Sequence, residues 1–204
     1  VPATVIDAIA TYMRRQYVQL GAPYDISAEA TKTVDDAHRW VNRLMGGEQS
    51  GMAVLGPSST QLATMLAECY SRKLRPGDEI ILTTLEHHSN IVPWQMVADE
   101  KGAKIRVVPI TDSGELRLDE YEKLFNANTK IACFTHVSNA LGTINPVKAM
   151  VAAARKHGVV TLVDGAQGDL AADDLRLVAG QGLVHEEAGD LAVERRVRRV
   201  LDAG

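Results

Sequence analysis

The chain has 204 residues, 46% hydrophobic and 24% charged, with a formal net charge of -4. This length suits one well-buried domain, or one domain with an appendage, and the composition is typical of a soluble globular protein. The acidic balance gives no reason to expect nucleic acid or a membrane surface as a partner, and the sequence has neither a signal peptide pattern nor an apolar run long enough for a bilayer. The two cysteines, Cys69 and Cys133, have no metal-binding spacing, so we expect a cytoplasmic protein without disulfides.

The N-terminal part of the sequence predicts helices. Apolar residues recur at helical spacing over residues 2–20, and Ser27 is the expected N-cap of a second helix that runs to about Met45. A short apolar strand, a polar loop and a third helix are expected next, at residues 52–55, 56–60 and 61–73.

From residue 79 the pattern alternates between strand and helix. The predicted strands are residues 79–84, 104–109, 130–136 and 159–163, and the predicted helices are residues 90–101, 118–126 and 146–157. Such units with short connections predict an α/β fold, with a mainly parallel sheet and helices on both faces. Ligands of these sheets bind at the carboxyl ends of the strands. Polar clusters lie at four of the ends, namely residues 58–59, 86–88, 138–139 and 164–167.

Each cluster has a chemical interpretation beside a plainer one. Ser58 and Ser59 open a helix, where hydroxyls and unpaired N–H groups bind anions, although such residues also serve as simple caps. The flat imidazole of His87 suits stacking on a planar ring, whereas a metal site at the paired histidines lacks a third ligand at suitable spacing. Asn139 suits either donation to a carboxylate or a turn. The acid Asp164, at the end of a buried strand, needs a partner such as a protonated pyridine nitrogen.

Three strings carry a family resemblance. They are Glu-His-His-Ser-Asn-Ile-Val-Pro-Trp-Gln at 86–95, Thr-His-Val-Ser-Asn at 135–139 and Val-Asp-Gly-Ala-Gln at 163–167. In this order and at these separations they resemble the class V aminotransferase family of pyridoxal-phosphate enzymes, and most nearly its cysteine desulfurases of the sulfur-mobilisation type. The resemblance implies that residues 1–167 form an incomplete large domain of a fold-type I pyridoxal-phosphate enzyme.

The resemblance also implies roles for single residues, with pyridoxal 5'-phosphate as the cofactor. His87 matches the histidine that stacks on the cofactor ring, Asp164 the aspartate that pairs with the pyridine nitrogen, and Gln167 the residue near the phenolic oxygen. Asn139 matches an asparagine near the substrate carboxylate. Ser58 and Ser59 stand where the family has a phosphate-binding Thr-Thr pair, in a Leu-Gly-Pro-Ser-Ser-Thr string that departs from the usual Arg-Gly-Thr-Thr-Glu.

The catalytic groups of the family have no match in this sequence. The lysine that holds the cofactor covalently follows the aspartate in a Ser-Gly-His-Lys string, but the last lysine here is Lys156. The nucleophilic cysteine belongs to the family's C-terminal domain, so neither Cys69 nor Cys133 stands in for it. We therefore expect non-covalent cofactor binding at best, and no activity from this chain alone.

Residues 168–204 differ in character from the rest. They use only nine amino-acid types, each of which a codon beginning with G or C can encode, and they include no lysine, isoleucine, serine or threonine. This contrast suggests a reading frame that shifts after Gln167, and a divergent helix-forming terminus is the alternative. We expect an atypical tail that is poorly packed or partly disordered.

Three functions compete at this stage. The first is a truncated cysteine desulfurase, whose family converts cysteine to alanine and leaves a persulfide on the enzyme. The second is a truncated aminotransferase or epimerase of the same fold, and the third is a non-catalytic binding module or partner subunit in sulfur transfer. The resemblance implies an amino acid as substrate and a homodimer as the assembly.

Overall fold

The chain divides after Leu55. The computed structural model describes residues 1–45, 51–168 and 183–185. These fall into two compact units, Val1–Leu55 and Gly56–Gly204. The predicted cofactor-binding domain, residues 1–167, spans both units and stays a prediction. Within the described residues, no helix is both long enough and apolar enough to cross a membrane.

The first unit consists of two helices, α1 (Ala3–Arg15) and α2 (Asp25–Leu44). The prediction that Ser27 caps the second helix is wrong, because α2 begins two residues earlier. The buried hydroxyl of Ser27 instead accepts from the backbone N–H of Ala22 (2.9 Å) and donates to the carbonyl of Gln19 (2.6 Å). It thereby closes the connection between the helices.

The second unit is the predicted α/β fold. Its elements are α3 (Ser59–Ser71), β1 (Glu79–Thr83), the 3-10 turn η1 (His88–Asn90), α4 (Val92–Lys101), β2 (Lys104–Val108), α5 (Leu118–Lys123), β3 (Thr129–Thr135), α6 (Val147–Lys156), β4 (Val160–Asp164) and β5 (Leu183–His185). The sheet order is β2-β1-β3-β4-β5, with β1 to β4 parallel and β5 antiparallel to β4. The expected tail therefore supplies one strand, and its remaining residues after Gly168 lie outside the described ranges.

The strand expected at residues 52–55 is not formed, and these residues have no regular secondary structure. An apolar run becomes a strand only when a neighbouring strand satisfies its backbone groups. None of the described strands pairs with these residues, so the prediction from composition alone was wrong.

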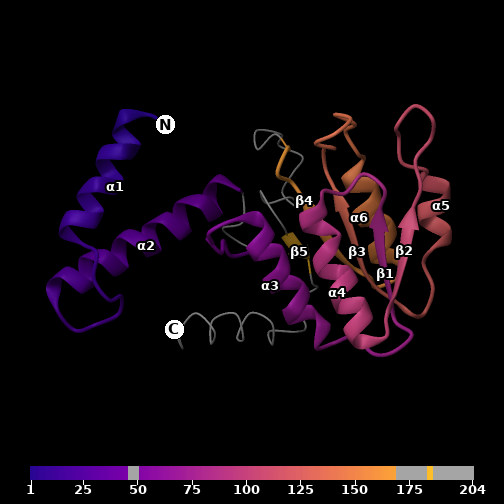
Figure 1. The fold of residues 1–204 in the computed structure, drawn as a ribbon, viewed down its shortest axis with the longest axis horizontal. Helices are drawn as coiled ribbons and strands as arrows, with labels where there is room; N and C mark the ends of the chain where they lie inside the picture. The colour runs from indigo at the N-terminus through magenta and orange to yellow at the C-terminus, as the bar shows by residue number, and fades with distance from the viewer. Residues whose placement is uncertain (46–50, 169–182, 186–204) are drawn as a thin grey trace. The chain divides into compact units, whose positions relative to one another are not determined.

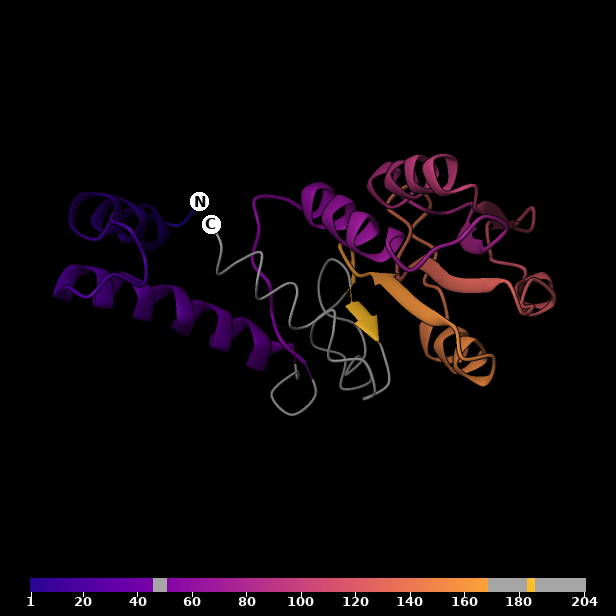
Figure 2. The same cartoon turned by 90° about the horizontal axis from the view of Figure 1, so that it is seen from below.

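Helices cover both faces of the sheet (Figure 1, Figure 2). Helices α3 and α4 pack on one face, against alternate strand residues that include Ile80, Leu82, Ile131, Cys133 and Leu162. Helices α5 and α6 pack on the other, against Ile81, Ala132, Phe134 and Val163. Strand β1 is consequently buried at every position, as expected for a parallel strand in the interior of a sheet. Strand β2 forms one edge of the sheet, and its Lys104 and Arg106 are exposed.

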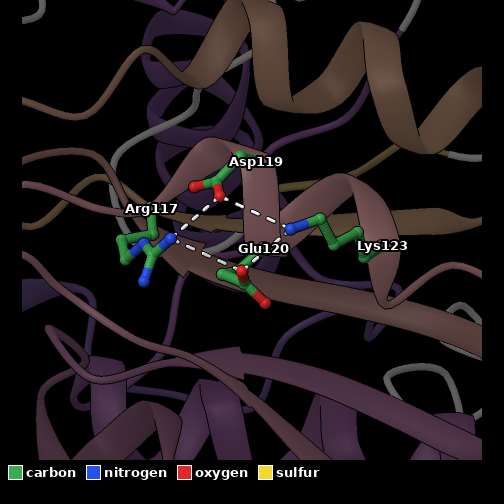
Figure 3. Close-up of polar contacts among 4 residues, drawn as sticks. All are labelled: Arg117, Asp119, Glu120 and Lys123. Atoms are coloured by element: carbon green, nitrogen blue, oxygen red, sulfur yellow. Dashed lines mark hydrogen bonds and ion pairs between the residues drawn. The ribbon is translucent and has the colours of Figure 1, made fainter.

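The short helix α5 has both exposed ion pairs and a buried aromatic ring. The ion pairs join Arg117, Asp119, Glu120 and Lys123 (Figure 3). Pairs so exposed to water contribute little to stability. The ring of Tyr121 is 1% exposed, and its hydroxyl donates to the carbonyl of Met150 at 3.0 Å. Burial of this ring against α6 therefore anchors the helix.

Two methionines test this division between core and surface. Met150 on α6 is 1% exposed, whereas Met96 on α4 is 65% exposed. We expect Met150→Ala to lower the free energy of unfolding by about 2–5 kcal/mol, because it leaves a cavity in the core. The matched control Met96→Ala should change it by about 0.5 kcal/mol or less. Urea denaturation of both variants makes the measurement, and equal losses would contradict the described core.

Candidate functional site

The parallel strands bring three predicted site residues to the edge of the sheet formed by the carboxyl ends of its strands, the carboxyl edge. His87 follows β1, Asn139 follows β3 and Asp164 ends β4. Because β1, β3 and β4 run in the same direction, their carboxyl ends meet at that edge (Figure 1). This is the position at which open α/β sheets bind ligands.

A hollow of about 300 Å³ opens beside the ends of β1 and β3. His87 and Asn139 both line it. The rest of its lining is Thr84, Leu85, Glu86, His88, Ile110, Ser138, Ala140 and Leu141. A volume of this order lies at the lower end of the range for small-molecule sites.

A second hollow, of only about 10 Å³, lies next to two further predicted site residues. Ser59 and Asp164 line it, together with Ala63, Leu66, Ser89, Asn90 and Leu162. Residues 86–90 contribute to both hollows, so one loop borders the two.

Ser58 and Gln167 line neither hollow. The hydroxyl of Ser58 accepts from the backbone N–H of Gln61 at 3.2 Å, so this serine is the N-cap of α3. Gln167 is exposed in the turn after β4. The structure therefore supports the capping interpretation of Ser58, and the ligand roles of both residues stay predictions.

The imidazole of His87 is exposed and has a defined tautomer. Its Nδ1 accepts from the backbone N–H of Ser89 at 3.2 Å and lies 2.8 Å from the hydroxyl of the same residue. A backbone N–H only donates, so Nδ1 of the neutral ring carries no proton and Nε2 does. The ring thus has a fixed local partner and an open face.

Asp164 ends an apolar strand, which suggests a buried side chain, but in the structure the residue is only half-buried. Its Oδ1 accepts from the backbone N–H of Ala166 at 3.0 Å. The neighbouring strand holds its backbone, since the N–H of His136 donates to the Asp164 carbonyl at 2.8 Å. This carboxylate has a fixed position at the sheet edge and is partly open to a cationic partner.

A buried carboxyl group, that of Glu86, lies at the base of this site, and nothing in the sequence pattern indicates a role for it. Its two oxygens accept from the hydroxyl of Thr83, from the backbone N–H of Thr135 (2.9 Å) and from the side-chain amide of Asn90 (2.7 Å). Burial raises the pKa of Glu86 to about 7, while these three hydrogen bonds oppose the rise and the nearby charge of Asp164 adds to it.

Two hydrogen bonds of this network join residues that are close in the sequence. Asn90 stands four residues after Glu86 and four before Trp94, and the indole N–H of Trp94 donates to the Asn90 carbonyl oxygen at 3.3 Å. Asn90 ends the 3-10 turn η1 and Trp94 lies in the first turn of α4, so this short stretch of chain brings the two side chains together. The bond to Thr135 spans 49 residues and has no signal in the sequence.

The three strings that carry the resemblance each include residues at this edge. The chain matches the family model for class-V aminotransferases over residues 1–172. It belongs to that family. It is 40% identical over 168 residues to a cysteine desulfurase of Synechococcus elongatus, which covers 81% of this chain and 27% of the relative. A cysteine desulfurase of Salmonella typhimurium is 39% identical over 168 residues, covering 81% of this chain and 41% of the relative.

Solved structures agree with the fold. A cysteine desulfurase from Thermococcus onnurineus matches with a TM-score of 0.74 and 27% identity, over 80% of this chain and 41% of that one. The cysteine desulfurase CsdA of Escherichia coli matches with a TM-score of 0.66 and 28% identity, over 82% of this chain and 42% of that one. The predicted α/β fold of fold-type I pyridoxal-phosphate enzymes is confirmed, and the chain spans less than half the length of these relatives.

The raised pKa of Glu86 predicts how stability depends on pH. Between its usual value of 4.5 and its folded value of about 7, the folded chain keeps a proton that the unfolded chain has released. The free energy of unfolding should therefore fall by roughly 3 kcal/mol as the pH rises through this window. Glu86→Gln should remove most of that slope in urea denaturation at pH 5 and pH 7. The exposed control Glu122→Gln should retain it, and an unchanged slope in Glu86→Gln would contradict the assignment.

Proposed function

We propose that this chain is the cofactor-binding part of a pyridoxal-phosphate-dependent cysteine desulfurase. The observation that carries the proposal is that His87, Asn139 and Asp164 lie at the carboxyl ends of one parallel sheet, the first two in one hollow and Asp164 in the hollow that the same loop borders. Identity of about 40% to cysteine desulfurases favours this activity over an aminotransferase or epimerase of the same fold. The serine pair after Leu55 is the feature that favours those alternatives.

The residues at the edge fit the chemistry of this cofactor. Pyridoxal phosphate, when bound, supplies an electron sink next to the substrate amino group. The open face of His87 would cover the aromatic ring, and the fixed carboxylate of Asp164 would hold a proton at the pyridine nitrogen. Hydroxyls and N–H groups at the start of α3, which Ser59 begins, would hold the phosphate.

Two amides would complete the site. The side chain of Asn139 lines the larger hollow beside His87 and would donate to the carboxylate of the amino acid substrate. Gln167, exposed three residues after Asp164, would donate to the phenolic oxygen. The proposed substrate is cysteine, and the proposed assembly is the homodimer that the resemblance implies.

Binding of the cofactor tests the proposal directly. We expect the chain to bind pyridoxal phosphate in a titration followed by absorbance. Asp164→Asn should weaken binding about 10- to 100-fold, since it removes a charge-assisted hydrogen bond. The matched control Asp112→Asn, at an exposed loop position, should bind as the unaltered chain does. Equal affinities for the two variants would contradict the role of Asp164.

Turnover gives a separate test. We expect no alanine from cysteine when the purified chain is supplied with pyridoxal phosphate. The proton transfer at the substrate and the attack on its sulfur need a lysine and a cysteine thiolate, and no residue of this sequence matches either of them. Alanine production above the rate of free pyridoxal phosphate would overturn this expectation.

A further inference from the structure

The ring of His87 depends on its loop for its position. It is exposed, and among the described residues its side chain bonds to Ser89, two residues away in the same turn. A partner so close in sequence moves with the ring. The place of the imidazole at the sheet edge therefore follows from whatever holds the loop.

The residues on either side of His87 are tied together. The amide of Asn90 donates to the carboxyl group of Glu86 at 2.7 Å, and its backbone N–H donates to the carbonyl of His87 at 2.8 Å. Both Glu86 and Asn90 are buried, at 8% and 2% exposure. Two hydrogen bonds thus close the loop on itself, and the exposed imidazole of His87 lies on its solvent side.

Three elements anchor this closed loop to the body of the unit. Thr83 of β1 and the backbone N–H of Thr135 at the end of β3 both donate to Glu86. The indole of Trp94 in α4, itself 1% exposed, donates to Asn90. Each anchor belongs to the rigid sheet or to a helix packed on it, so Glu86 connects a surface loop to the core.

The directions of these hydrogen bonds are forced. The indole N–H of Trp94 and the backbone N–H of Thr135 can only donate. The carbonyl oxygen of Asn90 must therefore face Trp94, and its NH₂ group must face Glu86. A protonated Glu86 still fits, since its proton can point to the hydroxyl of Thr83, but an amide at this position would put a donor against the NH₂ of Asn90.

We propose that Glu86 is a positioning residue, which sets the imidazole of His87 at the cofactor edge by locking the 86–90 loop to β3 and α4. This rests on the proposed function in taking His87 as the group that covers the cofactor ring. Glu86 is itself part of this loop, and both of its carboxyl oxygens are occupied by Thr83, Asn90 and Thr135, so it acts on the ring through the loop. The pattern of donors and acceptors in this network also predicts a double substitution that would keep its hydrogen bonds.

That double substitution is Glu86→Gln combined with Asn90→Asp. The carbonyl oxygen of the introduced glutamine would still accept from Thr135, and its NH₂ group would donate to the introduced carboxylate. That carboxylate would still accept from Trp94. The double variant keeps the size, the net charge and every hydrogen bond, with one bond reversed. The single variant Glu86→Gln leaves two donors facing each other.

The experiment measures pyridoxal phosphate affinity of the full chain in these variants and in His87→Ala. Glu86→Gln should weaken binding about tenfold, and the double variant should restore it to within about threefold. In a His87→Ala background, Glu86→Gln should have no further effect, because its action passes through the ring. The same tenfold loss in that background, or failure of the double variant to restore affinity, would overturn the proposal.

A second measurement separates this proposal from the proposed function. The imidazole signals of His87 in an NMR spectrum report its hydrogen bond to Ser89 without any cofactor. They should shift in Glu86→Gln and return in the double variant, while the signals of His157, which stacks on Phe125, stay in place. Unchanged His87 signals in Glu86→Gln would overturn the positioning role. A chain that fails to bind the cofactor but shows this pattern would refute the proposed function alone.

Discussion

The parallel pairing of β3 with β4 is the constraint on which the site depends. It places Thr135 opposite Asp164, the last residues of the two strands, and the pairing of β1 with β3 brings the loop after β1 to the same edge. Residues far apart in the chain become neighbours only through this register. A shift of β4 by one residue relative to β3 would turn Val163 toward the wrong face and would also move Asp164 away from Thr135.

Glu86 fixes the conformation of the loop at this edge through hydrogen bonds to three elements. Burying a carboxyl group costs free energy, and here the cost is visible as a raised pKa. Three donors from three different elements offset it in part. Apolar residues could fill the same space with less cost, but they would not select one arrangement of the loop, since directional hydrogen bonds specify geometry that packing alone leaves open.

The strand and helix pattern from β1 onward could be predicted from the sequence because it rests on local periodicity, and the ends at His87 and Asp164 followed from the rule for parallel sheets. Ser27 and residues 52–55 were misjudged because tertiary partners decided their conformation: Ser27 bonds to the connection before α2, and residues 52–55 have no paired strand among the described ones. The link from Glu86 to Thr135 could not be predicted, because its ends lie 49 residues apart. Nor did the sequence indicate that the polar edge divides into two hollows of unequal size.

The exposed cations on β2 have a consequence for how copies of this chain can associate. An edge strand offers unpaired N–H and C=O groups to any other strand, and continuous sheets across two molecules arise in this way. A strand added beside β2 would bring the ammonium group of Lys104 and the guanidinium group of Arg106 close to a second backbone and strip water from them. Joining two sheets edge to edge at β2 is therefore unfavourable.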